Sequence, residues 1–193
     1  MISKSKRGLI LILSSPSGAG KTTLAKKIEL SDRNFKISVS YTTRTPRTNE
    51  VDGVDYNFVT IKKFQELASQ DKFLEQAKVF GNYYATLKGP IEDNLAKGID
   101  YLFDIDWQGT EQVKKIMPSD IVSVFILPPS IEALEKRLSL RGTETPESLA
   151  TRLNTASYEI SFSHQFNHSV VNDDLATACA ETENIITQFL GWK

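Results

Sequence analysis

Short apolar runs alternate along the chain with stretches in which apolar residues recur every three or four positions. Leu9–Leu13, Ile99–Ile105 and Ile121–Leu127 are mainly apolar throughout, as is typical of parallel strands that are buried on both faces. Lys36–Ser40 and Ser169–Val171 are shorter strand candidates. Because strand-like and helix-like segments alternate, the pattern predicts an α/β fold with a doubly wound sheet.

Helical periodicity follows most of these runs. The predicted helices cover residues 21–30, 108–116 and 131–140, and two more begin at Thr145 and Asp174. The start at Thr145 is well marked, because a capping residue, a proline and an acid follow one another there.

Residues 41–88 interrupt this alternation. Tyr56–Val59 and Phe80–Ala85 have the pattern of short, exposed strands, and Ile61–Ser69 between them has helical spacing. We therefore predict a single domain over residues 1–193. In this domain 1–40 and 89–193 form the core, and 41–88 form a small inserted α+β lobe.

The charges of the chain nearly cancel, since 23 lysines and arginines stand against 24 acidic residues and the net charge is −1. No global field therefore favours nucleic acid as a partner. The single cysteine excludes a framework of internal disulfides and fits a reducing compartment. The first apolar run is too short for a signal peptide or a membrane helix. We expect a cytoplasmic protein without a membrane partner, and its oligomeric state stays open.

The segment Ser14–Thr23, with the sequence SSPSGAGKTT, directly follows the first apolar run. Pro16 and Gly18 would suit an ordinary turn, but a turn does not account for the lysine and hydroxyl at its end. A loop between a buried strand and a helix presents backbone N–H groups and the positive helix end to a phosphate. The pattern predicts an ATP-binding phosphate loop whose binding residues are Ser17, Gly18, Ala19, Gly20, Lys21, Thr22 and Thr23.

Within this loop, Lys21 is expected to reach the β- and γ-phosphates, and the Thr22 hydroxyl is expected to bind Mg²⁺. The first position of the pattern G-x-x-x-x-G-K-[ST] is Ser15 instead of glycine. A side chain at this position matters only if its Cβ strains the turn.

Two acids stand at the end of the predicted strand Ile99–Ile105. A solvated turn is the plain alternative, but it accounts poorly for Asp104 inside the apolar run. At this edge of an open α/β sheet, side chains face the ligand crevice. We predict that Asp104 holds Mg²⁺ through water and that Asp106 accepts a hydrogen bond from a substrate amine. Asp106–Gly109 also matches the D-x-x-G element of GTPases, but the chain has no [NT]-K-x-D tetrad.

Arginines occur in two groups, and their planar forks suit phosphate oxygens. Arg44 and Arg47 lie three positions apart in a hydroxyl-rich loop, and the second group consists of Arg137, Arg141 and Arg152. Each arginine alone would fit a solvated surface equally well. Together with the phosphate loop, the two groups predict two phosphoryl sites. The second group predicts a lid near residues 137–152 that closes over the transferring phosphates.

Several stretches together resemble the guanylate kinase family over nearly the whole chain: SPSGAGKTT, SVSYTTRTPR, EVDGVDYNF, FLEQAKVFGNYYAT, FDIDWQG, RGTE and VNDD. The resemblance implies the sheet of a phosphate-loop NTPase, a GMP-binding lobe at 41–88 and a helical lid. It implies transfer of the γ-phosphoryl group of ATP to GMP, with Mg²⁺ as cofactor, in purine nucleotide metabolism. Some scaffold proteins contain kinase-like domains that act as interaction modules, but these lack parts of the ATP site that are present here.

The resemblance also implies roles for single residues. The residues implied for the GMP phosphate are Arg44, Arg47, Tyr56 and Tyr84. Those implied for the guanine base are Ser40, Glu75, Thr86 and Asp106. ATP would be bound by the phosphate loop, with Asn172 near the adenine. The catalytic residues around the transferred group would be Lys21, Arg44, Arg137, Arg141 and Arg152. Without the resemblance, Glu75 would be taken for a surface residue of an amphipathic strand.

Overall fold

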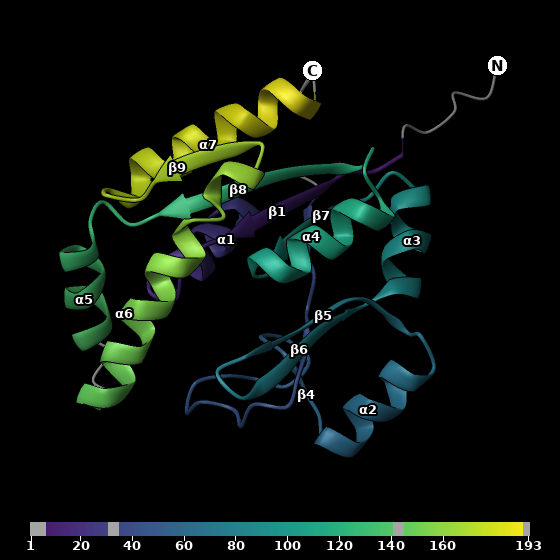
Figure 1. Cartoon of the computed structure of the whole chain (residues 1–193). Coiled ribbons are helices and arrows are strands. Elements are labelled where there is room, and N and C mark those ends of the chain that lie inside the picture. Colours follow the sequence, from purple (N-terminus) through teal and green to yellow (C-terminus); the bar gives the residue numbers. More distant parts are fainter. Residues whose placement is uncertain (1–6, 31–34, 141–144, 191–193) are drawn as a thin grey trace. The chain divides into compact units, whose positions relative to one another are not determined.

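The computed structural model describes residues 7–30, 35–140 and 145–190, and its strands form two sheets (Figure 1). The strands of the larger sheet are β1 (Ile10–Ser14), β2 (Phe35–Ile37), β7 (Asp100–Asp104), β8 (Ile121–Leu127) and β9 (His168–Val171). Their order in the sheet is β2-β7-β1-β8-β9. The strands of the smaller sheet are β3 (Tyr41–Thr42), β4 (Asn57–Phe58), β5 (Phe73–Val79) and β6 (Asn82–Leu87). Their order is β4-β3-β6-β5.

The helices alternate with the strands of the larger sheet, which is mainly parallel, so the predicted α/β fold is confirmed. The helices are α1 (Lys21–Leu30), α2 (Ile61–Ser69), α3 (Lys88–Ala96), α4 (Trp107–Ile116), α5 (Ile131–Ser139), α6 (Pro146–Ile160), the short 3₁₀ helix η1 (Ser163–Gln165) and α7 (Leu175–Leu190). Within the described residues, none of these helices has the length and apolar character that crossing a membrane requires.

The chain divides into two compact units. The first unit consists of Met1–Ile10, Asn34–Tyr101 and Gln108–Ile121, and the second of Leu11–Arg33, Leu102–Trp107 and Val122–Lys193. The first unit contains the small sheet with α2 and α3. The second contains the phosphate loop with α1, α5, α6 and α7. The predicted division into a core and an inserted lobe at 41–88 stays a prediction.

Burial explains why the strands of the larger sheet form where the apolar runs lie. All five residues of β1 are buried, and so are the five central residues of β8. In the second unit, α5 and α6 lie side by side (Figure 1) and bury Leu134, Leu138 and Ala156 between them. As predicted, α6 begins after Thr145, whose side chain accepts a hydrogen bond from the Ser148 N–H, and Pro146 lies in its first turn.

The small sheet differs from the prediction in its strand limits. The predicted strand Phe80–Ala85 begins instead at Asn82, because Phe80 and Gly81 form a tight turn in which both φ angles are positive, 46° and 81°. Val79 pairs with Asn82 across this turn, and β5 fills the segment after α2. A two-residue hairpin favours positive φ at both central positions, which Gly81 adopts freely. Lys36–Ser40 is also shorter than predicted, since β2 ends at Ile37.

Candidate active site

The phosphate loop, Ser15–Thr22, connects β1 to α1 as predicted. Gly18 and Gly20 have φ angles of +98° and +97°, which side chains rarely adopt. A Cβ on Gly20 would lie 2.3 Å from the Asn172 Nδ2, and a Cβ on Gly18 would lie 2.9 Å from the Leu134 Cδ1. Both glycines are therefore required by the backbone conformation and by close neighbours.

Ser15, the departure from the phosphate-loop pattern, fits without strain. Among the described residues, the non-glycine residues with positive φ are Asp71 and Phe80, so the backbone at Ser15 is one that any residue adopts. The Ser15 side chain is buried, and its Oγ donates a hydrogen bond to the Pro16 carbonyl at 3.0 Å. A side chain at this first position is thus compatible with the loop.

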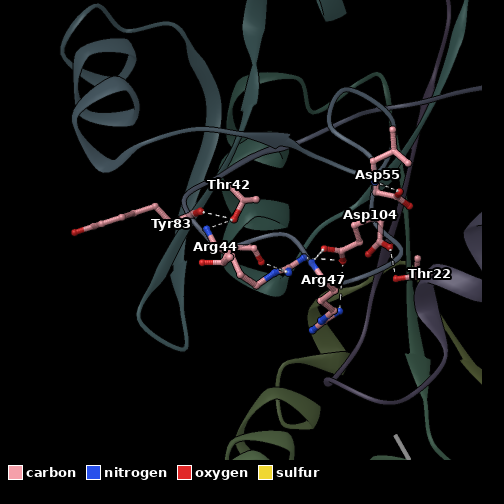
Figure 2. Close-up of polar contacts among 10 residues, drawn as sticks. Thr22, Thr42, Arg44, Arg47, Asp55, Tyr83 and Asp104 are labelled. Carbon is pink, nitrogen blue, oxygen red and sulfur yellow. Dashed lines mark hydrogen bonds and ion pairs between the residues drawn. The ribbon is translucent and has the colours of Figure 1, made fainter. Parts of the chain in front are cut away.

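Lys21, Thr22 and Asp104 meet at the end of the loop. The Lys21 Nζ lies 2.7 Å from the Asp104 Oδ1 and donates to the Ile105 carbonyl at 3.0 Å. The Thr22 hydroxyl donates to the Asp104 Oδ2 at 2.8 Å (Figure 2). The structure therefore brings together the cation predicted for phosphate and the two groups predicted for a metal ion.

The donor atoms at this point fit Mg²⁺. Thr22 and Asp104 offer only oxygen, the element that Mg²⁺ prefers. Within the described ranges, no cluster of three or more histidine, cysteine or acidic residues exists that could enclose a metal ion. Mg²⁺ commonly takes one or two protein ligands and completes its shell with phosphate oxygens and water. The pair is therefore suited to an ion that arrives with a nucleotide.

Two of the predicted lid arginines contact the same region of the second unit. Arg152 donates to the Ser17 Oγ at 2.7 Å, and Arg137 donates to the Asn172 carbonyl at 2.8 Å. The Arg137 Nη1 is buried without a hydrogen-bond partner among the described residues. Arg141 lies outside the described residues. The two arginines that are described thus lie against the phosphate loop and the segment that braces it.

Asn172 has a structural role that the sequence did not indicate. Its side chain is buried, and its Nδ2 donates to the Ala19 carbonyl in the phosphate loop at 2.7 Å. This contact explains why Gly20, which lies directly against Asn172, cannot carry a Cβ. The predicted position of Asn172 near the adenine stays a prediction.

Glu159 in α6 was not predicted as a site residue. Its carboxyl group lies near the Ser17 N–H and near Lys21, Asp106 and Arg152. Burial raises the pKa of Glu159 to about 7, against the attraction of Lys21. In the sequence this residue looks like an exposed acid of an amphipathic helix. The available signal was its spacing from Arg152, seven positions or about two helical turns earlier.

A β-bulge at Leu74 sets the two faces of the small sheet in the first unit. Phe73 pairs with Leu87, but Glu75 pairs with Thr86, so β5 has one extra residue between these pairs. Without the bulge Phe73 and Glu75 would share a face, because side chains alternate along a strand. With it, Phe73 packs with Phe64 and Ala85 against α2, and Glu75 lies on the opposite face.

The face opposite α2, which we call the ligand face, contains most residues predicted to bind GMP. The register places Glu75 and Thr86 next to each other there, and both are buried, with 3% and 2% of their surface exposed. The alternative of a surface Glu75 is therefore wrong. The Thr86 hydroxyl has no hydrogen-bond partner among the described residues. By the same register and alternation, the ligand face also includes Ser40, Thr42, Tyr56, Phe58 and Tyr84.

Arg44 lies beside aromatic rings of this face and binds a carboxylate. Its guanidinium carbon lies 5.3 Å from the centroid of the Tyr56 ring. Its Nη2 lies 2.8 Å from the Glu50 Oε1, one of the polar contacts drawn around Arg44 in Figure 2. The Glu50 Oε2 accepts from the Arg47 N–H at 2.8 Å. Burial alone would lower the pKa of Arg44, but the hydrogen bond and charge of Glu50 raise it. The sequence did not single out Glu50. Its carboxylate shows that Arg44 and Arg47 can together bind an oxyanion.

Comparison with known proteins decides the family. The family model for guanylate kinase matches residues 7–189. The guanylate kinase of Paramagnetospirillum magneticum is 48% identical over 182 residues, which cover 94% of this chain and 85% of that protein. The guanylate kinase of Mesorhizobium japonicum is 49% identical over 181 residues, covering 94% and 83%. The chain belongs to the guanylate kinase family. Guanylate kinases are ATP:GMP phosphotransferases, and this chain is an enzyme of that class.

The guanylate kinase assignment extends to the fold. The crystal structure of guanylate kinase from Anaplasma phagocytophilum matches with a TM-score of 0.79 and 36% identity, over 95% of this chain and 86% of that one. The GTPase alternative, which rested on the D-x-x-G element, has no support beside these matches. Asp106, predicted to read guanine, belongs to the second unit and lies near Glu159 there. Its role stays a prediction, as do the roles of the other guanylate kinase site residues.

Proposed function

We propose that the phosphate loop of the second unit binds ATP and the ligand face of the small sheet binds GMP. The observation that supports this proposal most is the buried pair Glu75 and Thr86 on the ligand face, which also carries Tyr56 beside Arg44. A buried carboxylate and a cation that binds oxyanions suit the two ends of a nucleoside monophosphate. On this basis Arg44, Arg47, Tyr56 and Tyr84 bind the GMP phosphate, and Ser40, Glu75 and Thr86 bind the base. For Asp106, a role at the base rests on the family resemblance alone.

The chemistry of the base explains why the acceptor would be GMP. Guanine presents N1–H and N2–H₂ as neighbouring donors, so the carboxylate of Glu75 can accept from both. Adenine has an acceptor at N1, which would face an oxygen of the buried carboxylate with no proton between them. Two acceptors facing each other in a buried site cost several kcal/mol, so discrimination of roughly a thousandfold is expected. The Thr86 hydroxyl, which has no partner in the described part of the chain, adds one more group for a polar base edge.

The transfer itself needs charge neutralisation and alignment and no general base, because the phosphate of GMP is already an anionic nucleophile. Lys21 leaves its contact with Asp104 to bind the β- and γ-phosphates, and Arg137, Arg141 and Arg152 neutralise charge on the transferred group. Thr22 and Asp104 would hold Mg²⁺, Asp104 through water. When bound, Mg²⁺ would neutralise charge on the phosphates of ATP.

The proposal is tested by a coupled assay that measures ADP formation from ATP with GMP, AMP, CMP or UMP as acceptor. We expect GMP to be strongly preferred. Glu75→Gln should lower the ratio of kcat/KM for GMP over AMP, because its amide can accept only one of the two guanine donors. An unchanged ratio in this variant would show that Glu75 does not read the base. GTP hydrolysis without any acceptor would instead favour a GTPase.

A further inference from the structure

Glu159 is a buried acid that the roles proposed above do not use. Only 8% of its surface is exposed, and its Oε2 has no hydrogen-bond partner among the described residues. Buried polar atoms in native proteins almost always have a partner, and a buried charge is costly unless it is paired. This carboxyl group therefore requires an explanation.

The surroundings of Glu159 are the phosphate loop and its cations. Its carboxyl group lies near the Ser17 N–H, is attracted by Lys21 and Arg152, and is repelled by Asp106. Arg152, on the same helix, donates to the Ser17 Oγ at 2.7 Å. Arg152 of α6 thus binds the Ser17 side chain, and Glu159 of the same helix lies near the Ser17 backbone.

The end of α6 that carries Glu159 is itself fixed. Trp107, which directly follows Asp106, stacks on Phe162 with ring centroids 3.8 Å apart and an angle of 5° between the planes. Tyr158 contacts both rings edge-on. These ring contacts pack the C-terminal end of α6 and the residues just after it against the segment that follows β7. Glu159 therefore meets the phosphate loop from a fixed position.

A glutamine would fill the same space without the cost of burying a charge. The carboxylate is therefore best explained by the two cations that attract it. We propose that Glu159 is a positioning residue, whose negative charge orients Lys21 and Arg152 for phosphoryl transfer. This inference rests on the proposed binding of ATP to that loop.

The test is steady-state kinetics of the full chain with ATP and GMP. We expect Glu159→Gln to lower kcat about tenfold or more, the scale seen when catalytic groups are displaced. The KM values for ATP and GMP should change by no more than about twofold, because glutamine keeps the size and polarity of the side chain next to the loop. Glu159→Ala should show the same loss of kcat and, in addition, a raised KM for ATP alone, because the loop contact is also lost.

The matched control is Ala156→Gly, which weakens α6 at a buried position while Glu159 stays in place. Circular dichroism shows at which temperature all variants are folded, and the kinetics are measured there. An unchanged kcat in Ala156→Gly is expected. A wild-type kcat in Glu159→Gln, or an equal loss of kcat in Ala156→Gly, would overturn this inference and leave the proposed function standing. A wild-type chain that is inactive with ATP and GMP would overturn the proposed function and this inference with it.

Discussion

Replacing Glu159 by glutamine should make the chain more stable at alkaline pH. Burial raises the pKa of this carboxyl group from its ordinary 4.5 to about 7. A group whose pKa is raised on folding contributes stability below its unfolded pKa and loses it as the pH rises through the folded pKa. The wild-type chain therefore loses stability from this group between pH 4.5 and pH 7, whereas glutamine does not titrate.

The size of the effect follows from the change in pKa. Each pKa unit corresponds to 1.36 kcal/mol, so a rise from 4.5 to about 7 is at most about 3 kcal/mol. We expect Glu159→Gln to match the wild type near pH 4.5 and to exceed its unfolding free energy by up to about 3 kcal/mol at pH 8. For a chain of this size, that gain corresponds to a Tm higher by roughly 6–12 °C.

Urea denaturation followed by circular dichroism at several values between pH 5 and pH 8 measures the difference. Other titrating groups are common to both proteins and largely cancel. Glu147→Gln is the matched control on the same helix, because the backbone and the Thr145 side chain lower the pKa of that exposed acid. It should gain nothing as the pH rises. A difference between Glu159→Gln and wild type that is constant from pH 5 to pH 8 would refute the argument.

Four further substitutions test the site. Lys21→Ala should lower kcat by about a hundredfold or more, and an unchanged kcat in a folded variant would contradict the phosphate-loop assignment. Gly20→Ala should cost about 1–3 kcal/mol, measured by urea denaturation, because its Cβ would lie 2.3 Å from the Asn172 Nδ2. Ser15→Gly should leave kcat and KM unchanged and cost less than about 1 kcal/mol; an increased kcat would show that Ser15 does strain the loop. Arg44→Lys should raise the KM for GMP about tenfold through the loss of one charge-assisted hydrogen bond, and an unchanged KM would remove Arg44 from the phosphate site.

Periodicity and loop chemistry predicted the framework well. The limits of α2 and β8 agree with the prediction, since each is a strongly patterned segment between clear breaks. The phosphate loop and Asp104 could be identified because their residue types and spacing are tied to one strand and one helix. These features depend on neighbours in the sequence.

The residues that were missed depend on distant neighbours. Glu159 has the local pattern of a surface acid, but it is buried near Ser17, Lys21 and Asp106, which are far away in the sequence. Glu50 is an ordinary loop residue until Arg44 folds back onto it. The bulge at Leu74 has no marker in the sequence, because no glycine is present there. Such features arise from tertiary packing, which residue patterns do not contain.

The bulge also bears on how the small sheet folds. β3 and β4 are only two residues long and specify little by themselves. If β5 slipped by one residue against β6, its side chains would change faces, and Glu75 would enter the apolar cluster around Phe64 and Ala85. An unpaired carboxylate there would cost several kcal/mol. Glu75, which we propose selects the base, would thus also destabilise a mispaired sheet. When the small sheet is stably folded, the residues of its ligand face are therefore already in register.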